Sequence, residues 1–296
     1  MKRLRLLSPA KLNLLLKVNF KRPDGYHDLT TLFERIDLCD ELIFERTKDG
    51  RITIDCQHPH VPRGPGNLVY KVAALLQDKF RIRQGVRVNL KKNIPVAAGL
   101  GGGSGNAATT LLGLNQLWEL GLSKAQLMTL GKTMGSDVPF FIAQSSWAVG
   151  TQRGDQIQSL SLKTKLWHVL VVPCLKVYTK DVFGAFLTSK KSTVEARTKM
   201  LTKPKVNVNI LIHVLRKNDV PRIGTLLSND LEAAIVKLHP QLSKLKNKFE
   251  KLDVGGVCFS GSGPSVFCVA RSQKQAKAVA RSLRKTYARV FVVRTY

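Results

Sequence analysis

Short runs of apolar residues with polar interruptions dominate the first third of the chain. Alternation of apolar and polar side chains is typical of strands, and it predicts strands over residues 4–7, 11–20, 33–46, 51–56 and 86–90. A helix is expected after Asn67, because asparagine is a favourable N-cap residue. One side of that helix would carry Leu68, Val72, Leu75, Leu76 and Phe80.

Helical and strand patterns follow one another irregularly in the rest of the chain. Ser123 and Gln126 form a capping box that opens a helix to about residue 132, and an apolar run covers 138–142. Further helices are expected over 106–118, 181–187, 206–216, 230–249 and 271–285, and strands over 167–172, 265–270 and 289–294. Since no regular strand–helix–strand repeat is present, we expect an α+β fold. Loss of periodicity at 150–161 predicts a junction between two domains, residues 1–155 and 156–296.

The most informative segment is the run Pro95-Val-Ala-Ala-Gly-Leu-Gly-Gly-Gly-Ser-Gly-Asn106, which is rich in glycine directly before an expected helix. Glycine lets successive backbone N–H groups approach a ligand at little steric cost, and a helix N-terminus attracts anions. The run therefore predicts a cradle for a nucleotide polyphosphate. A glycine-rich turn into a helix, with no ligand, is the alternative.

Two well-known phosphate-binding motifs do not fit this run. A Walker A loop ends in Gly-Lys-Ser/Thr, but no lysine lies between Pro95 and Trp118. The dinucleotide fingerprint requires a glycine three residues after its second glycine, and Ser104 and Asn106 stand where that glycine would be. A different nucleotide-binding loop is expected.

Two charged residues stand in apolar surroundings, where burial of a charge is costly. Lys11 interrupts an otherwise apolar predicted strand, and Asp137 lies in a Gly-Ser-Asp turn that opens the apolar run 138–142. Phosphoryl transfer requires a base for the accepting hydroxyl and compensation of charge, so both residues are candidates for catalysis. The alternatives are that Lys11 extends to solvent and that Asp137 only caps the following segment.

The composition, with 44% hydrophobic and 23% charged residues, is that of a globular protein. No stretch approaches the roughly 20 apolar residues of a membrane helix, so no membrane association is expected. Pro9, Lys11 and Asn13 interrupt the apolar start too early for a signal peptide. Five scattered cysteines without a Cys-x-x-Cys pair predict reduced thiols and a cytoplasmic protein. No metal site is predicted at His58 and His60, because no other ligand lies nearby.

The net charge of +28 is high, and residues 151–296 carry 27 lysines and arginines against 8 acidic residues. A nucleic-acid surface, steering of polyanionic substrates, and a general enrichment of basic residues on solvated faces would each explain it. The basic residues are spread along this half, with few aromatic residues between them. We therefore favour the third explanation and expect no nucleic-acid partner.

Five segments resemble, in order and spacing, motifs of the GHMP kinase superfamily. They are Ser8-Pro-Ala-Lys-Leu-Asn-Leu14, Arg22-Pro-Asp-Gly-Tyr-His27, the run from Pro95 to Asn106, Gly135-Ser-Asp-Val-Pro-Phe-Phe141 and Gly261-Ser-Gly-Pro264. The resemblance covers nearly the whole chain. It implies a two-domain GHMP-kinase-like architecture with the active site in the cleft between the domains. It also implies an ATP-dependent kinase that uses Mg²⁺ and phosphorylates an alcohol.

The resemblance of the first two motifs implies a small-molecule acceptor, a methylerythritol linked to cytidine diphosphate. The resemblance implies that its 2-hydroxyl is phosphorylated on the methylerythritol phosphate route to isoprenoid precursors. Asp137 would take the proton of that hydroxyl, and Lys11 would keep the carboxylate charged and help to orient the hydroxyl. Another GHMP kinase, or a basic nucleic-acid-binding protein on a related fold, are the alternatives.

The resemblance also assigns binding residues. Tyr26 and Phe33 would stack on the cytosine, His27 would hydrogen-bond its edge, and Asn13 would lie beside the reacting hydroxyl. The residues implied to bind ATP are Pro95, Val96, Ala97, Ala98, Gly99, Leu100, Gly101, Gly102, Gly103, Ser104 and Gly105. Of these, Ser104 would place its hydroxyl near the β-phosphate or Mg²⁺.

Two departures from the family pattern lie close to these motifs. Gly105 stands where a second serine is usual, which would remove one hydroxyl contact to phosphate. Gln152-Arg-Gly-Asp155 replaces the usual Gly-Arg-Gly-Glu. Neither change touches Lys11 or Asp137.

Overall fold

The computed structural model describes residues 2–191 and 207–296. Contacts divide the chain into two compact units, each containing helices and strands, so the predicted α+β class is confirmed. The first unit comprises Met1–Lys11, Arg35–Val96 and Gly101–Leu160, and the second comprises Leu12–Glu34, Ala97–Leu100 and Ser161–Tyr296. The single domain boundary expected after residue 155 stays a prediction. No helix in the described part of the chain is long and apolar enough to cross a bilayer.

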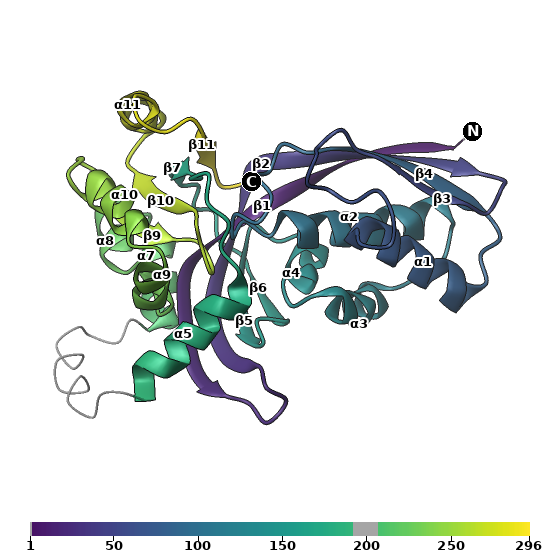
Figure 1. Cartoon of the computed structure of the whole chain (residues 1–296), viewed down its shortest axis with the longest axis horizontal. Coiled ribbons are helices and arrows are strands. Elements are labelled where there is room, and N and C mark those ends of the chain that lie inside the picture. Colours follow the sequence, from purple (N-terminus) through teal and green to yellow (C-terminus); the bar gives the residue numbers. More distant parts are fainter. Residues whose placement is uncertain (1, 192–206) are drawn as a thin grey trace. The chain divides into compact units, whose positions relative to one another are not determined.

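The first unit is a sheet with helices on one side (Figure 1). Two long strands, β1 (Arg3–Lys21) and β2 (His27–Thr47), contribute to both units. The other elements of the first unit are β3 (Ile52–Asp55), α1 (Leu68–Phe80), β4 (Gly85–Lys91), α2 (Gly102–Leu117), α3 (Lys124–Met134), α4 (Val138–Ala143), β5 (Trp147–Gln152) and β6 (Gln156–Leu160). Neighbouring strands are hydrogen bonded in the order β3-β4-β2-β1, and β5 pairs with β2 and β6.

Two of the three predicted helix starts in the first unit are confirmed, those of α1 and α3. The Asn67 side chain accepts a hydrogen bond from the backbone N–H of Val69 at 2.9 Å, which begins α1. Ser123 and Gln126 make both hydrogen bonds of the capping box at the start of α3. The local sequence therefore determines where these two helices begin.

The segment 150–161, where the sequence loses its periodicity, contains the end of β5 and the whole of β6. Strands β5 and β6 pair there as an antiparallel hairpin, with Trp147 opposite Leu160 and Thr151 opposite Gln156. The strand pattern is weak because most side chains of β6 are exposed or half-buried. Backbone pairing, rather than burial of an apolar face, holds this segment as a strand.

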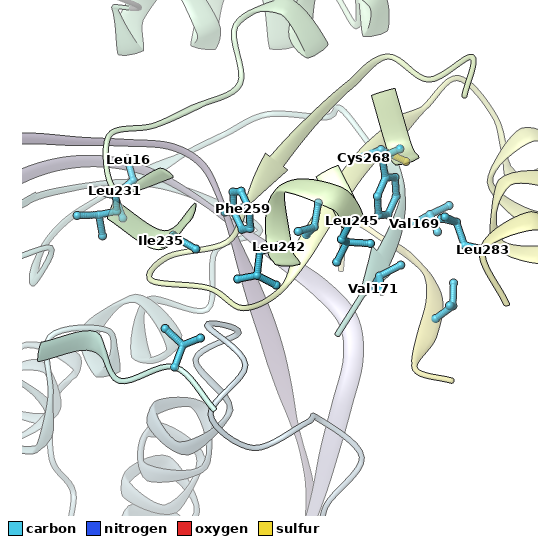
Figure 2. Packing of buried hydrophobic residues seen from close by; sticks show 14 of the residues in the cluster. Leu16, Val169, Val171, Leu231, Ile235, Leu242, Leu245, Phe259, Cys268 and Leu283 are labelled. Carbon is cyan, nitrogen blue, oxygen red and sulfur yellow. The ribbon is translucent and has the colours of Figure 1, made fainter. Parts of the chain in front are cut away.

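The second unit contains an antiparallel sheet in the order β11-β7-β10-β9. Its elements are β7 (Trp167–Val171), α5 (Thr179–Lys191), α7 (Val208–Arg216), α8 (Val220–Thr225), β8 (Ser228–Asn229), α9 (Glu232–Leu238), α10 (Gln241–Glu250), β9 (Gly256–Phe259), β10 (Val266–Ala270), α11 (Gln273–Arg284) and β11 (Val290–Arg294). Figure 2 shows side chains of α9 and α10 meeting those of β7, β9 and β10 in a hydrophobic core that includes Val171, Leu245 and Phe259.

One long helix predicted in this unit is wrong in detail. Residues 230–249 form two helices, α9 and α10, because Pro240 lacks a backbone N–H and restricts the residue before it. Residues 207–216 of the helix expected over 206–216 are described, and α7 begins after the Asn207 N-cap; residue 206 lies outside the described residues. The strands expected near 167–172, 265–270 and 289–294 are confirmed as β7, β10 and β11.

Candidate active site

Lys11 and Asp137 lie together in the first unit. The Lys11 Nζ is 3.5 Å from the Asp137 Oδ2, and the two side chains are 5% and 28% exposed. The alternative that Lys11 extends to solvent is therefore wrong. A nearly buried ammonium thus lies beside a carboxylate that stays partly open to solvent.

Asp137 occupies the N-cap position of α4, yet its side chain accepts no hydrogen bond from the described N–H groups of that helix. Its backbone is helical, with φ −82° and ψ −14°, whereas a capping side chain normally sits on an extended residue. Pro139, in the first turn, has no N–H to donate. Capping therefore does not account for this carboxylate.

The glycine run does not end where the helix was expected to begin. Helix α2 starts at Gly102 rather than at residue 106, so part of the run forms its first turn. Gly101 precedes it with φ +68°, and a Cβ there would lie 3.0 Å from both Lys11 Cγ and the Phe141 ring. Only glycine fits this backbone and this approach, and it leaves the first N–H groups of α2 without a side-chain cap.

The earlier part of the run, Ala97–Leu100, packs within the second unit. Gly99 has φ +74°, and a Cβ on it would lie 2.3 Å from the Ser260 carbonyl oxygen. The Ser260 Oγ donates to the Gly99 carbonyl at 3.0 Å, and the Ser265 Oγ donates to the Ala98 carbonyl. Ser260 and Ser265, which flank the motif Gly261–Pro264, thus fix Ala98 and Gly99 of the run; the sequence alone did not indicate these serines.

Gly105, near the end of the run, packs against β1. The Gly105 N–H donates to the Gly101 carbonyl at 2.8 Å and so belongs to the helix. A Cβ at Gly105 would lie 3.0 Å from Ser8 Oγ and from the Pro9 carbonyl oxygen. Ser104, by contrast, is half-buried and lies near Gly135, in the turn that carries Asp137.

The residues expected to bind the acceptor lie in the second unit and differ in exposure. Tyr26 is 58% exposed at the tip between β1 and β2, where its N–H donates to Asp24 Oδ1 at 3.1 Å. The His27 ring stacks on Phe183 of α5, with ring centroids 4.9 Å apart. Phe183 is a further aromatic residue of this region that the sequence alone did not indicate.

Asn13 and Phe33 are buried, in contrast to Tyr26. The Asn13 amide donates to Thr31 Oγ1 at 2.8 Å, and Thr31 donates to the Leu15 carbonyl at 2.7 Å, so a hydroxyl fixes the amide. Phe33 is only 1% exposed, and stacking on a base would require its ring to become accessible. Its expected role stays a prediction.

Two family models match the chain, the GHMP kinases N terminal domain over residues 67–145 and the GHMP kinases C terminal over residues 211–289. A homoserine kinase from Cytophaga hutchinsonii has the same fold at 21% identity, with a TM-score of 0.72 over 100% of this chain and 95% of that chain. The domain matches, the glycine loop and the fold define this chain as a GHMP kinase.

Closer relatives narrow the class. A crystal structure of a 4-(cytidine 5'-diphospho)-2C-methyl-D-erythritol kinase is 31% identical, with a TM-score of 0.81 over 99% of this chain and 100% of that chain. The 4-diphosphocytidyl-2-C-methyl-D-erythritol kinases of Exiguobacterium sibiricum and Brevibacillus brevis are each 38% identical, over 97% and 99% of this chain and 96% of their own lengths. The chain belongs to the family of 4-diphosphocytidyl-2-C-methyl-D-erythritol kinases.

Proposed function

We propose that the chain transfers the γ-phosphoryl group of ATP to the 2-hydroxyl of 4-diphosphocytidyl-2-C-methyl-D-erythritol. The observation that carries the proposal is the 3.5 Å approach of the Lys11 ammonium to the Asp137 carboxylate, with Gly101 at the start of α2 directly against Lys11. A candidate base and a candidate phosphate cradle thus lie side by side in one compact unit. The names of the relatives supply the acceptor.

The acceptor hydroxyl is tertiary, which makes it a crowded and poor nucleophile. Asp137 would accept its proton as the bond to phosphorus forms, and the partly exposed carboxylate has the access that this requires. The Lys11 ammonium would compensate the negative charge of the Asp137 carboxylate and orient the acceptor hydroxyl. The nearly buried position of Lys11 limits competition from water.

The start of α2 fits a polyphosphate. Its first N–H groups have no side-chain cap, and a Cβ at Gly103 would meet only Leu68, at 3.7 Å, so the turn has room on its outer side. The helix dipole favours an anion at this end. Mg²⁺, held by the phosphates and the Ser104 hydroxyl, would neutralise charge on the transferring group.

Tyr26 and His27 would recognise the cytosine. The exposed Tyr26 ring offers a stacking face, and Phe183 orients the His27 ring so that its edge is fixed. Stacking of a base on an aromatic ring contributes about 1–3 kcal/mol. All five cysteines are free thiols, which agrees with our proposal that the protein works in the reducing cytoplasm.

The experiment is ATP turnover by the purified chain with Mg²⁺ and four acceptors in parallel, namely 4-diphosphocytidyl-2-C-methyl-D-erythritol, galactose, mevalonate and homoserine. We expect ADP release with the cytidylyl acceptor alone, and product phosphorylated on the 2-hydroxyl by NMR. Turnover of another acceptor, or ATP binding without turnover of any of them, would contradict the proposed substrate.

A further inference from the structure

The glycine run is anchored at both ends by one carboxylate, that of Asp40. This residue lies within β2 and is completely buried. Its Oδ1 accepts hydrogen bonds from the backbone N–H groups of Asn93 and Ile94, each at 2.8 Å. Its Oδ2 accepts from Asn106 Nδ2 at 2.9 Å and forms an ion pair with Lys92.

These partners lie directly before the run and at its last residue. Asn93 and Ile94 follow β4 and lead directly into Pro95, whereas Asn106 ends the run and lies in α2. The carboxylate therefore ties the segment before the run to the helix in which the run ends, within the first unit. Burial strengthens hydrogen bonds to a charged acceptor, because water does not compete for them.

Lys92 completes the network. Its Nζ bonds Asp40 Oδ2 and also donates to the Asn106 Oδ1 at 3.2 Å, while the Asn106 amide donates to Ser8 Oγ at 3.0 Å. The Lys92 Nζ would lie 3.3 Å from a Cβ on Gly102, the first residue of α2. The network thus sets the position of a positive charge at the start of the helix as well as that of the backbone.

We infer that Asp40 is a positioning residue for ATP, which preorganises the first turn of α2 and the Lys92 ammonium before the phosphates arrive. The inference rests on the proposed function in taking ATP as the nucleotide. Cradles built in advance gain affinity because the ligand does not have to order them. Asp40 itself is buried under the run and acts through Asn106 and Lys92, so it contacts no phosphate.

Asp40→Asn tests the inference because it preserves the shape of the side chain and replaces one of its two hydrogen-bond acceptors, Oδ2, by a donor. The new amide oxygen can still accept from Asn93 and Ile94, but the amide nitrogen then faces the Asn106 and Lys92 donors. We expect the dissociation constant of Mg-ATP, measured calorimetrically without acceptor, to rise roughly tenfold. The KM of the cytidylyl acceptor should stay within about twofold, since the acceptor residues lie elsewhere.

Glu34→Gln is the matched control. Glu34 is also completely buried, accepts from Thr295 Oγ1 at 2.6 Å and lies 3.0 Å from His168 Nε2, but it belongs to the second unit and not to the glycine run. This variant should lose thermal stability while its affinity for ATP changes less than about twofold. The comparison separates positioning of the run from a general loss of stability.

If Asp40→Asn does not fold, Asn106→Ala is the second test. It keeps the Asp40–Lys92 ion pair and removes the hydrogen bonds of the Asn106 side chain to Asp40, Lys92 and Ser8. We expect a rise in the ATP dissociation constant of roughly threefold to fivefold. Unchanged affinity in a folded variant of Asp40 or Asn106 would overturn the inference, as would losses of affinity that merely follow melting temperature across all three variants.

Failure of the proposed function has a different outcome. If the wild-type protein binds ATP but does not phosphorylate the cytidylyl acceptor, the proposed acceptor is wrong. A weaker affinity for ATP in Asp40→Asn than in Glu34→Gln would then still support the role of Asp40. If the folded wild-type protein does not bind ATP, both are overturned.

Discussion

Replacement of Asp137 by asparagine removes a proton acceptor and a charge while it preserves the shape of the side chain. A positioned general base contributes about 10²–10⁴-fold to a rate, which corresponds to roughly 3–5 kcal/mol of activation free energy. The carboxylate is partly exposed and makes no capping bond to the described helix α4, but its removal takes the ion-pair partner from the nearly buried Lys11 ammonium. We therefore expect kcat to fall by about 10²–10⁴-fold, with a modest loss of thermal stability and little change in ATP affinity.

The geometry also predicts how Lys11 contributes. Two unit charges 3.5 Å apart attract one another by about 5 kcal/mol at an effective dielectric constant of about 20. Desolvation of the buried ammonium and solvation of the partly exposed carboxylate offset much of that energy. Because the remaining attraction holds the carboxylate ionised and in place, we expect Lys11→Met to lower kcat roughly thirtyfold, the equivalent of about 2 kcal/mol of activation free energy.

The double mutant distinguishes a pair from two independent residues. If Lys11 acts through Asp137, the double variant should be no slower than Asp137→Asn alone, because the partner of Lys11 is already lost. The assay is coupled ADP release at saturating ATP, with product formation checked by NMR. Asp253→Asn, which removes the carboxylate of the exposed pair with Arg271, is the control and should leave kcat unchanged.

Two results would refute this reasoning. Turnover of Asp137→Asn within about threefold of wild type would remove the carboxylate from the chemical step. If the fold-losses in kcat of the two single variants multiply in the double variant, Lys11 and Asp137 act independently despite their proximity.

Three other measurements follow from the structure. Tyr26→Ala should raise the KM of the cytidylyl acceptor about tenfold to a hundredfold and leave the KM of ATP unchanged; equal effects on both would contradict a stacking role. Gly224→Ala should destabilise the fold by about 4 kcal/mol or more in denaturant unfolding, because its Cβ would lie 1.0 Å from the Gly255 carbonyl oxygen. A thiol reagent at pH 8 should label the exposed Cys174 first, and the other four thiols should react fully only in denaturant. Burial raises the pKa of three others, to about 11 for Cys39 and about 12 for Cys258 and Cys268.

Helix starts with their own capping residues could be predicted, because Asn67 and Ser123 satisfy backbone groups within three residues of themselves. The start of α2 could not, since glycine is unfavourable inside a helix. The first turn of α2 forms nevertheless, and Gly105 packs closely against Ser8 and Pro9. Tertiary contact overrides local preference at that point.

The two candidate catalytic residues could be found because each is a charge in an apolar segment, and such a charge needs a partner. Asp40 had no comparable signal, since one acidic residue in a half-polar strand is ordinary. Its partners Lys92 and Asn106 lie 52 and 66 residues away in sequence. A hydrogen-bond network assembled from separate elements leaves no local pattern in the sequence. The contacts of Asp40 with the residues around the glycine run could therefore be found only in the structure.

The Gly105 substitution shows how side-chain direction decides what a sequence departure means. Glycine in place of the usual serine suggested the loss of a hydroxyl contact to phosphate. A Cβ at this position would point to Ser8 Oγ and the Pro9 carbonyl oxygen, each 3.0 Å away, and would lie 3.7 Å from Phe141. A serine hydroxyl here would meet β1 instead of a ligand at the start of α2. The departure therefore concerns how closely α2 packs on β1. The proposed phosphate site does not depend on it, because its backbone donors and Ser104 remain.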